Sequence, residues 1–193
     1  MLAKSRELFA VDAAGDREAI PADLMEPVFR TVIRYSTDGH ELEQLTQLYP
    51  DVPSAVQTTI LLSLSATPDA ALLSKSLAFV MSDVVRRQNI HYIFRHPSLH
   101  PDVQWQWLRS EFDELYTRYA DSISLLHGVL RGVLGGMTTQ EELEQAEQFF
   151  ADKDTAKYKA VLSQGIESAR IRVAWLQRDR EAVAEWVLKH VKQ

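Results

Sequence analysis

The spacing of apolar residues is the feature that most constrains the fold of this chain, because they recur every three or four positions along nearly all of it. Between residues 102 and 119 this spacing places a single apolar stripe on one side of a helix: Trp105, Leu108, Phe112, Leu115, Tyr116 and Tyr119. No stretch of convincing length alternates apolar and polar residues as a half-buried strand does. We therefore predict an all-α fold.

Prolines and glycines divide this pattern into segments. The chain has only seven of each, and most fall between periodic stretches, where they serve as caps and turns. Thr67-Pro68-Asp69 and Thr138-Thr139, the latter followed by Glu141-Glu142, are N-cap signals. The predicted helices cover residues 2–14, 21–35, 41–49, 54–65, 67–81, 86–96, 102–119, 122–134, 139–151, 155–176 and 179–191. Short connections between them indicate antiparallel helix pairs stacked side by side as a HEAT/ARM-like α-solenoid arc, in a single helical domain over residues 1–193.

Composition and charge exclude several classes of partner. The formal net charge of −6 argues against a broad nucleic-acid surface, which needs clustered Lys and Arg. The longest weakly charged run, residues 122–140, is interrupted by His127 and Arg131, so no membrane span is expected. The first ten residues carry three charges and no apolar segment of the signal-peptide kind. We predict no nucleic-acid and no membrane partner, and a cytoplasmic location.

The chemistry of a hydrolase is missing from the sequence. The zinc motif His-Glu-x-x-His occurs nowhere, and the chain has no Cys to supply thiolate ligands. His96 and His100 are four residues apart, but Pro97 and Pro101 make a continuous helix there unfavourable, so we interpret both as loop histidines. Gly128-x-x-x-Gly132 lies within an apolar helix rather than after a strand, which favours close helix packing over phosphate binding. We predict no metal, no cofactor and no catalytic residue in this chain, which would then not be an enzyme by itself.

Short motifs follow one another in a recognisable order between residues 84 and 186. They are Val-Arg-Arg-Gln-Asn at 85–89, Arg-His-Pro at 95–97, Trp-Gln-Trp-Leu-Arg-Ser-Glu-Phe at 105–112, Phe-Phe at 149–150, Ile-Arg-Val-Ala-Trp-Leu at 171–176, and Trp186. No single motif is specific, but their order and spacing resemble the helical C-terminal domain of the gluzincin zinc aminopeptidases. That family includes the puromycin-sensitive, endoplasmic-reticulum and insulin-regulated aminopeptidases.

The resemblance implies a role for the chain within a larger protein. It would be a substrate-capping and regulatory domain of a zinc aminopeptidase that removes N-terminal residues from peptides. The zinc site would lie in upstream catalytic domains of the same polypeptide, which with peptide substrates would be its partners. The alternative is a free-standing α-solenoid scaffold that binds another protein. A His-Glu-x-x-His sequence upstream of Met1 in the reading frame would decide between the two.

One group of cations is a candidate site for the C-terminus of a peptide. Arg87, His91 and Arg95 are spaced i, i+4 and i+8, so on an α-helix they would share a face, beside Tyr92. A guanidinium group can donate two parallel hydrogen bonds to a carboxylate. The resemblance also implies that Arg95 falls where an antigen-trimming relative places an Arg for the peptide terminus. The other interpretation is a solvated charged face that makes surface ion pairs.

Two expectations concern packing. The aromatic residues of the motifs are expected in the core: Trp105, Trp107, Phe112, Trp175 and Trp186. If preceding helices of a solenoid are missing, the N-terminal side should expose an apolar patch, since each repeat normally buries a face against its neighbour.

Overall fold

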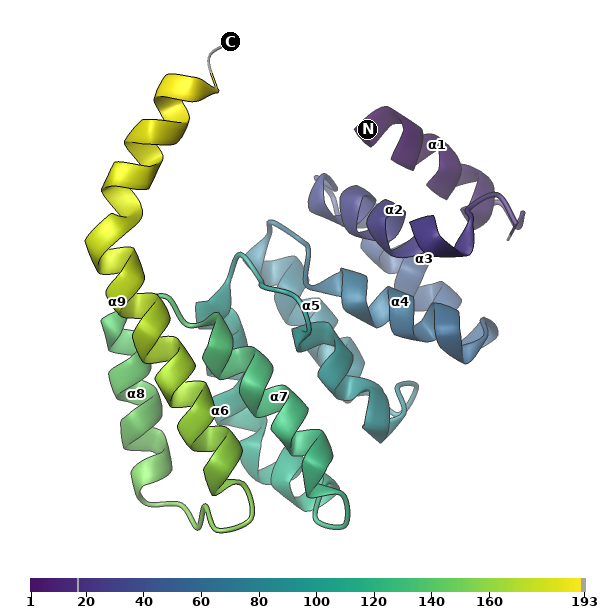
Figure 1. Cartoon of the computed structure of the whole chain (residues 1–193). Coiled ribbons are helices and arrows are strands. Elements are labelled where there is room, and N and C mark those ends of the chain that lie inside the picture. Colours follow the sequence, from purple (N-terminus) through teal and green to yellow (C-terminus); the bar gives the residue numbers. More distant parts are fainter. Residues whose placement is uncertain (17, 192–193) are drawn as a thin grey trace.

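The computed structural model describes residues 1–16 and 18–191, and within them the all-α prediction is confirmed, with no strand. The elements, in chain order, are α1 (Leu2–Ala13), α2 (Ala22–Arg34), α3 (His40–Leu48), η1 (Tyr49–Asp51), α4 (Ser54–Leu64), α5 (Ala70–Met81), η2 (Arg87–Phe94), α6 (Pro101–Arg118), α7 (Ile123–Gly136), α8 (Gln140–Ala151) and α9 (Lys159–His190). η1 and η2 are 3₁₀ helices, and the others are α-helices (Figure 1).

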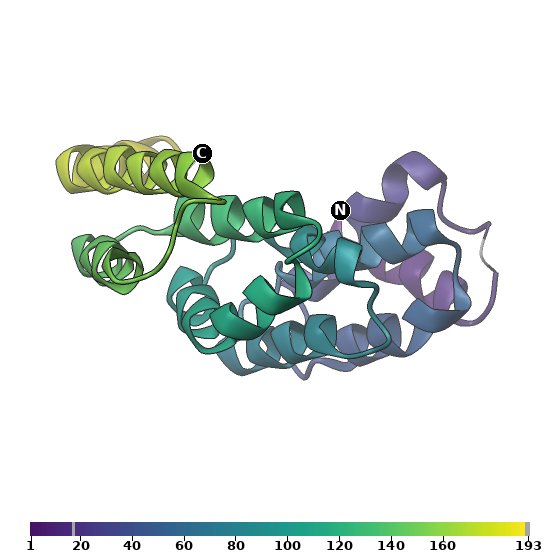
Figure 2. The same ribbon diagram turned by 90° about the horizontal axis from the view of Figure 1, so that it is seen from below.

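The helices form two rows (Figures 1 and 2). In one row α1, α2, α4, η2, α7 and α9 each contact the next, and in the other α3, α5, α6 and α8 do the same. The rows are joined by α3 with α4, α6 with α7, and α8 with α9. The all-α class is confirmed for the described residues, and the HEAT/ARM-like solenoid arrangement stays a prediction.

Local sequence signals set two helix starts: α8 is capped by Thr139 as predicted, whereas α5 begins three residues later than the predicted range 67–81, with Asp69 as its cap. The Asp69 side chain accepts a hydrogen bond from the Leu72 backbone N–H at 2.9 Å and caps α5. At α8, Thr139 Oγ1 accepts from the Glu142 N–H at 3.2 Å, and Glu142 Oε2 accepts from the Thr139 N–H at 3.0 Å. This capping box satisfies backbone donors that a helix N-terminus otherwise leaves unpaired.

An aromatic cluster fills the space between α6, α8 and the start of α9. Trp105 is 1% exposed, packs edge-on against Phe149 at 5.6 Å between ring centroids, and donates its indole N–H to Gln145 at 3.1 Å. Phe112 is 3% exposed, and Trp107 is half-buried against Phe94. The core prediction is confirmed for Trp105 and Phe112, whereas Trp107 is half-buried and packs against the core.

The C-terminal helix corrects two predictions. Residues 155–176 and 179–191 were expected to form two helices, but α9 runs unbroken over 32 residues, since neither Gly nor Pro separates the two ranges. Trp175 and Trp186 are 46% and 61% exposed, so their assignment to the core is wrong.

The physical reason is the lack of a neighbouring helix. Val173 is the last buried residue described, and the second half of α9 extends beyond α7 and α8 (Figure 1). At 100° per residue, Leu176, Val183 and Val187 continue the side of α9 that is buried at Ala169 and Val173. An exposed apolar patch was predicted at the N-terminal side. Val11 and Leu24 are exposed there, but the exposed large apolar residues are most numerous on α9, in the C-terminal part of the chain. Among the described helices, none is long and apolar enough to cross a membrane.

Candidate functional site: a cationic cavity between η2, α7 and α9

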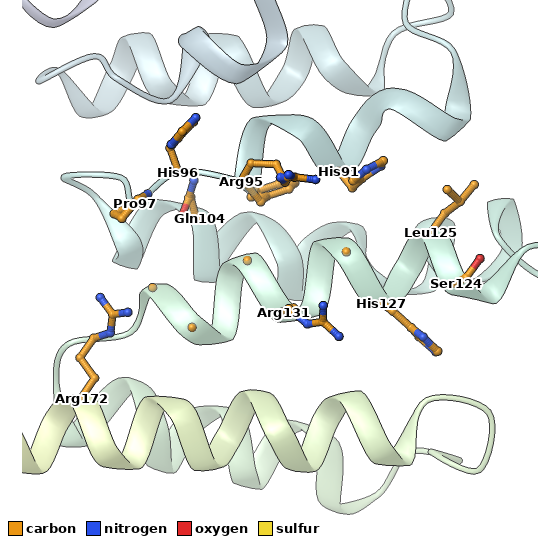
Figure 3. A pocket seen from close by; sticks show the side chains of 15 residues that line it. His91, Arg95, His96, Pro97, Gln104, Ser124, Leu125, His127, Arg131 and Arg172 are labelled. Atoms are coloured by element: carbon orange, nitrogen blue, oxygen red, sulfur yellow. The ribbon is translucent and has the colours of Figure 1, made fainter. Parts of the chain in front are cut away.

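A cavity of about 760 Å³ opens between η2, α7 and α9 (Figure 3). Its lining includes three arginines and three histidines, namely Arg95, Arg131, Arg172, His91, His96 and His127. No Asp or Glu lines it, although the chain as a whole carries a formal charge of −6. We call it the cationic cavity. Its volume is in the range of ligand sites, and its charge favours an anionic ligand.

Glycines of α7 bring its backbone close to η2 and into the cavity wall. A methyl group added at Gly128 would lie 2.9 Å from His91 Cβ, and one at Gly132 would collide with Phe94, including its backbone carbonyl. The prediction that Gly128 and Gly132 permit close packing is therefore confirmed. Gly135 and Gly136 also line the cavity, and a methyl group at Gly135 would meet no atom within 4 Å. Part of the α7 wall is thus helix backbone that no side chain covers.

The three arginines of the cavity are free of carboxylate partners. Within the described residues, no Asp or Glu forms an ion pair with Arg95, Arg131 or Arg172, and all three are exposed. Elsewhere on α9, Arg170 is held by Glu147 and Glu167, both at 2.8 Å. The guanidinium groups that line the cavity can therefore bind an added anion without first breaking an ion pair.

The histidines and Gln104 of the lining differ in their burial and in their hydrogen-bond partners. Burial lowers the pKa of His91, and the charge of Arg95 lowers it further. His96 Nε2 lies 2.7 Å from Glu26 Oε1, which ties this edge of the cavity to α2. His127 Nε2 and Gln104 Nε2 are buried without a hydrogen-bond partner.

The predicted site residues are only partly brought together. His91 and Arg95 both line the cationic cavity, whereas Arg87 does not. The expected shared face is wrong because residues 87–94 form a 3₁₀ helix rather than an α-helix. Residues four apart are rotated by roughly 40° in an α-helix but by roughly 120° in a 3₁₀ helix. Arg87 instead has its carbonyl bonded by the Tyr119 hydroxyl at 2.8 Å, and burial raises the pKa of that phenol.

Sequence reasoning missed the part of the site that α7 and α9 contribute. His127 and Arg131 were noted only because they interrupt an apolar run, and Arg172 was part of a motif. Figure 3 shows Arg131 and His127 on the side of α7 that faces α9, and Arg172 reaching from α9 toward α7. The available signal was the spacing of His127 and Arg131, which lie one turn apart in an otherwise apolar helix.

The histidines do not form a metal centre. His96 contacts Glu26, while His100 Nε2 lies 2.8 Å from the Pro68 carbonyl oxygen, so the two rings have separate partners. No group of three or more His, Asp or Glu residues that could hold a metal ion occurs in the described part of the chain. The described residues therefore supply no set of ligands for a zinc ion.

Fold and site together define an all-helical domain with a cavity lined by arginines and histidines. The family model for the ERAP1-like C-terminal domain matches residues 1–171. The chain belongs to this family of C-terminal domains. The match ends before Trp175 and Trp186, the two motif tryptophans that are exposed.

Similar proteins are named as aminopeptidases. The alanine/arginine aminopeptidase of Saccharomyces cerevisiae is 29% identical over 188 residues, which are 95% of this chain and 22% of that protein. Aminopeptidase 2 of Candida albicans is 28% identical over 96% of this chain and 21% of its own length. Aminopeptidase M1-B of Oryza sativa is 30% identical over 79% of this chain and 17% of its own length. The chain thus spans about a fifth of the length of these relatives.

Proposed function

We propose that this chain is the C-terminal helical domain of a zinc aminopeptidase and that it caps the substrate cleft of upstream catalytic domains. In this proposal the zinc and the catalytic residues belong to those domains, and the chain alone does not cleave peptides. The cationic cavity receives the C-terminal carboxylate of a peptide whose N-terminus is being trimmed. The observation that carries this role is a cavity with three unpaired arginines and no carboxylate.

Within the cavity, Arg95 and His91 are the proposed carboxylate ligands. Arg95 is the C-cap residue of η2 and is exposed, so its side chain can reach a ligand without unfolding the segment. His91 has its pKa lowered by burial and by Arg95, so an anion between the two would favour its protonated form. Arg87 was part of the candidate site, but it lies outside the cavity lining.

Arg95→Ala is expected to weaken binding of a peptide with a free C-terminus about fivefold, since an exposed charge-assisted contact contributes roughly 1 kcal/mol. The measurement is fluorescence anisotropy of an N-terminally labelled peptide titrated with the 193-residue chain. Amidation of the peptide should cause a similar loss, and should cause little further loss with the Arg95→Ala chain. If mutation and amidation act independently, Arg95 is not the carboxylate ligand.

Arg87→Ala is the matched control, because it removes the same charge from the same segment outside the cavity. It should leave peptide affinity unchanged. An equal loss with both variants would point to a general effect of charge, and would contradict the assignment of the carboxylate to Arg95.

The stability of the chain should fall as the pH drops below about 6.5, and His91 should account for part of this. Its pKa is lowered from 6.5 in the folded chain, so the unfolded state binds more protons in that window. Protonation therefore favours unfolding, and the contribution is fully present only above pH 6.5. Urea denaturation at pH 7.5 and pH 5.5 should show a smaller loss for His91→Gln than for the wild type. An identical loss would show that His91 is not held in its neutral form.

The alternative function, a free-standing scaffold, differs in what lies upstream. A His-Glu-x-x-His sequence in the reading frame before Met1 supports the aminopeptidase proposal. A separate test is hydrolysis of an aminoacyl fluorogenic substrate by the purified chain. Chelator-sensitive hydrolysis by this chain alone would contradict the proposal that catalysis resides elsewhere.

A further inference from the structure

The cationic cavity holds more cationic groups than one carboxylate can use. Arg95 and His91 lie on the η2 side, while Arg131, His127 and Arg172 come from α7 and α9 (Figure 3). An exposed carboxylate is matched by one guanidinium fork, which donates two parallel hydrogen bonds. When the η2 groups bind the C-terminal carboxylate of a peptide, the α7 and α9 groups therefore remain free to bind another anionic group.

The cavity is also long enough for more than a single terminal group. The glycine-lined stretch of α7 alone runs from Gly128 to Gly136, a helical rise of roughly 12 Å at 1.5 Å per residue. An extended peptide advances about 3.3 Å per residue, so the last three or four residues of a peptide fit along this length. The glycines leave the α7 backbone uncovered beside that path.

The α7 and α9 cations are available to such a peptide. Arg131 also lines an adjoining hollow that contains Glu167, but Glu167 is engaged by Arg170 at 2.8 Å. Gln104, which is 2% exposed, lines the same cavity and its amide nitrogen has no hydrogen-bond partner. His127 Nε2 is likewise unpaired. The arginines and these unpaired nitrogen atoms favour a second anionic or polar group over an apolar side chain.

We infer that the cavity has a second anion subsite, supplied by Arg131 and His127 on α7 and by Arg172 on α9, that selects peptides with an acidic side chain near the C-terminus. This inference rests on the proposed function, because it assumes that the first subsite takes the terminal carboxylate. The ligand class is a peptide with at least two carboxylates within its last four residues. Free phosphate shares the charge but cannot occupy both subsites.

The test uses four labelled peptides of equal length, titrated with the 193-residue chain at low ionic strength. They combine a Glu or a Leu at the penultimate position with a free or an amidated C-terminus. The Glu peptide with a free terminus should bind about fivefold more tightly than its Leu counterpart, and the gain should shrink at 0.3 M salt. Inorganic phosphate should compete only weakly with the peptide that carries both carboxylates.

The double variant Arg131→Gln/Arg172→Gln should abolish the preference for Glu while leaving the effect of amidation intact. Arg34→Gln/Arg180→Gln is its control, because it removes two exposed arginines that do not line the cavity. Circular dichroism checks that both variants fold. A single variant, Gly135→Leu, should weaken all four peptides by filling open space beside the cavity wall.

Each outcome separates the two subsites. Equal binding of Glu and Leu peptides, with a clear effect of amidation, overturns the second subsite and leaves the proposed function standing. A Glu preference with no effect of amidation supports the second subsite and contradicts the carboxylate-receiving role of Arg95. A Glu preference that survives in Arg131→Gln/Arg172→Gln, displacement by phosphate as effective as by peptide, or no binding of any peptide, overturns the inference.

Discussion

Trp105→Ala is expected to lower the free energy of unfolding by about 3–5 kcal/mol, the largest effect among the substitutions considered. Trp105 is 1% exposed and packs between α6 and α8, with contacts to Phe149 and Phe150 at 5.6 Å and 6.5 Å between ring centroids. Truncation leaves a cavity among aromatic rings that other helices hold in place. It also leaves Gln145 without the indole donor. Urea denaturation followed by far-ultraviolet circular dichroism measures the change.

Trp186→Ala is the matched substitution, because it removes the same type of side chain at another of the sequence motifs. Trp186 is 61% exposed on the second half of α9 and stacks only on His190 at 4.3 Å, so its loss should change stability by no more than about 0.5 kcal/mol. A loss comparable to that of Trp105→Ala would show that this half of α9 is covered in solution, for example by a second molecule. Repeating the denaturation at several protein concentrations would identify such association.

Gly132→Ala is expected to destabilise the fold by about 1–3 kcal/mol, because it overpacks the contact between α7 and η2. The added methyl would collide with Cβ and the backbone carbonyl of Phe94, and a backbone atom cannot turn aside as a flexible side chain does. The collision would push η2 away from α7 and displace Arg95, which follows Phe94 directly. Gly132→Ala should therefore weaken peptide binding as well as lower stability.

Gly135→Ala tests this explanation on the same helix. A methyl there meets no atom within 4 Å, so the higher helix propensity of Ala should stabilise the chain by up to about 1 kcal/mol. Thermal unfolding of the two variants beside the wild type gives the comparison. Equal shifts of the midpoint in the same direction would contradict a steric role for Gly132, because propensity alone would then explain both.

These contacts link packing to the proposed role. The cavity exists where η2 approaches α7 closely enough for backbone, rather than side chains, to form part of the wall. The cations then project from three elements around a space without carboxylates. The proposed capping function and the two proposed anion subsites all depend on this single arrangement, so the Gly132 variant tests each of them.

The sequence by itself determined the features that depend on neighbouring residues. Helix caps at Asp69 and Thr139 were predictable because each uses a side chain within three residues of the backbone group that it bonds. The stripe that contains Trp105 and Phe112 was predictable because helical periodicity places such residues on one face. The family could be inferred from motif order, which the match over residues 1–171 confirms.

Tertiary structure alone decided the features that depend on distant parts of the chain. Trp186 has the apolar character of a core residue, but burial requires a neighbouring helix, and none of the described helices covers the second half of α9. Arg95 lines the cavity and Arg87 does not, and η2, packed between α4 and α7, is wound as a 3₁₀ helix rather than as the expected α-helix. Arg131 and Arg172 are 41 positions apart and reach the same cavity only because α9 packs along α7. Periodicity reports which face of a helix is apolar, whereas the partner of that face is set by contacts that no local pattern encodes.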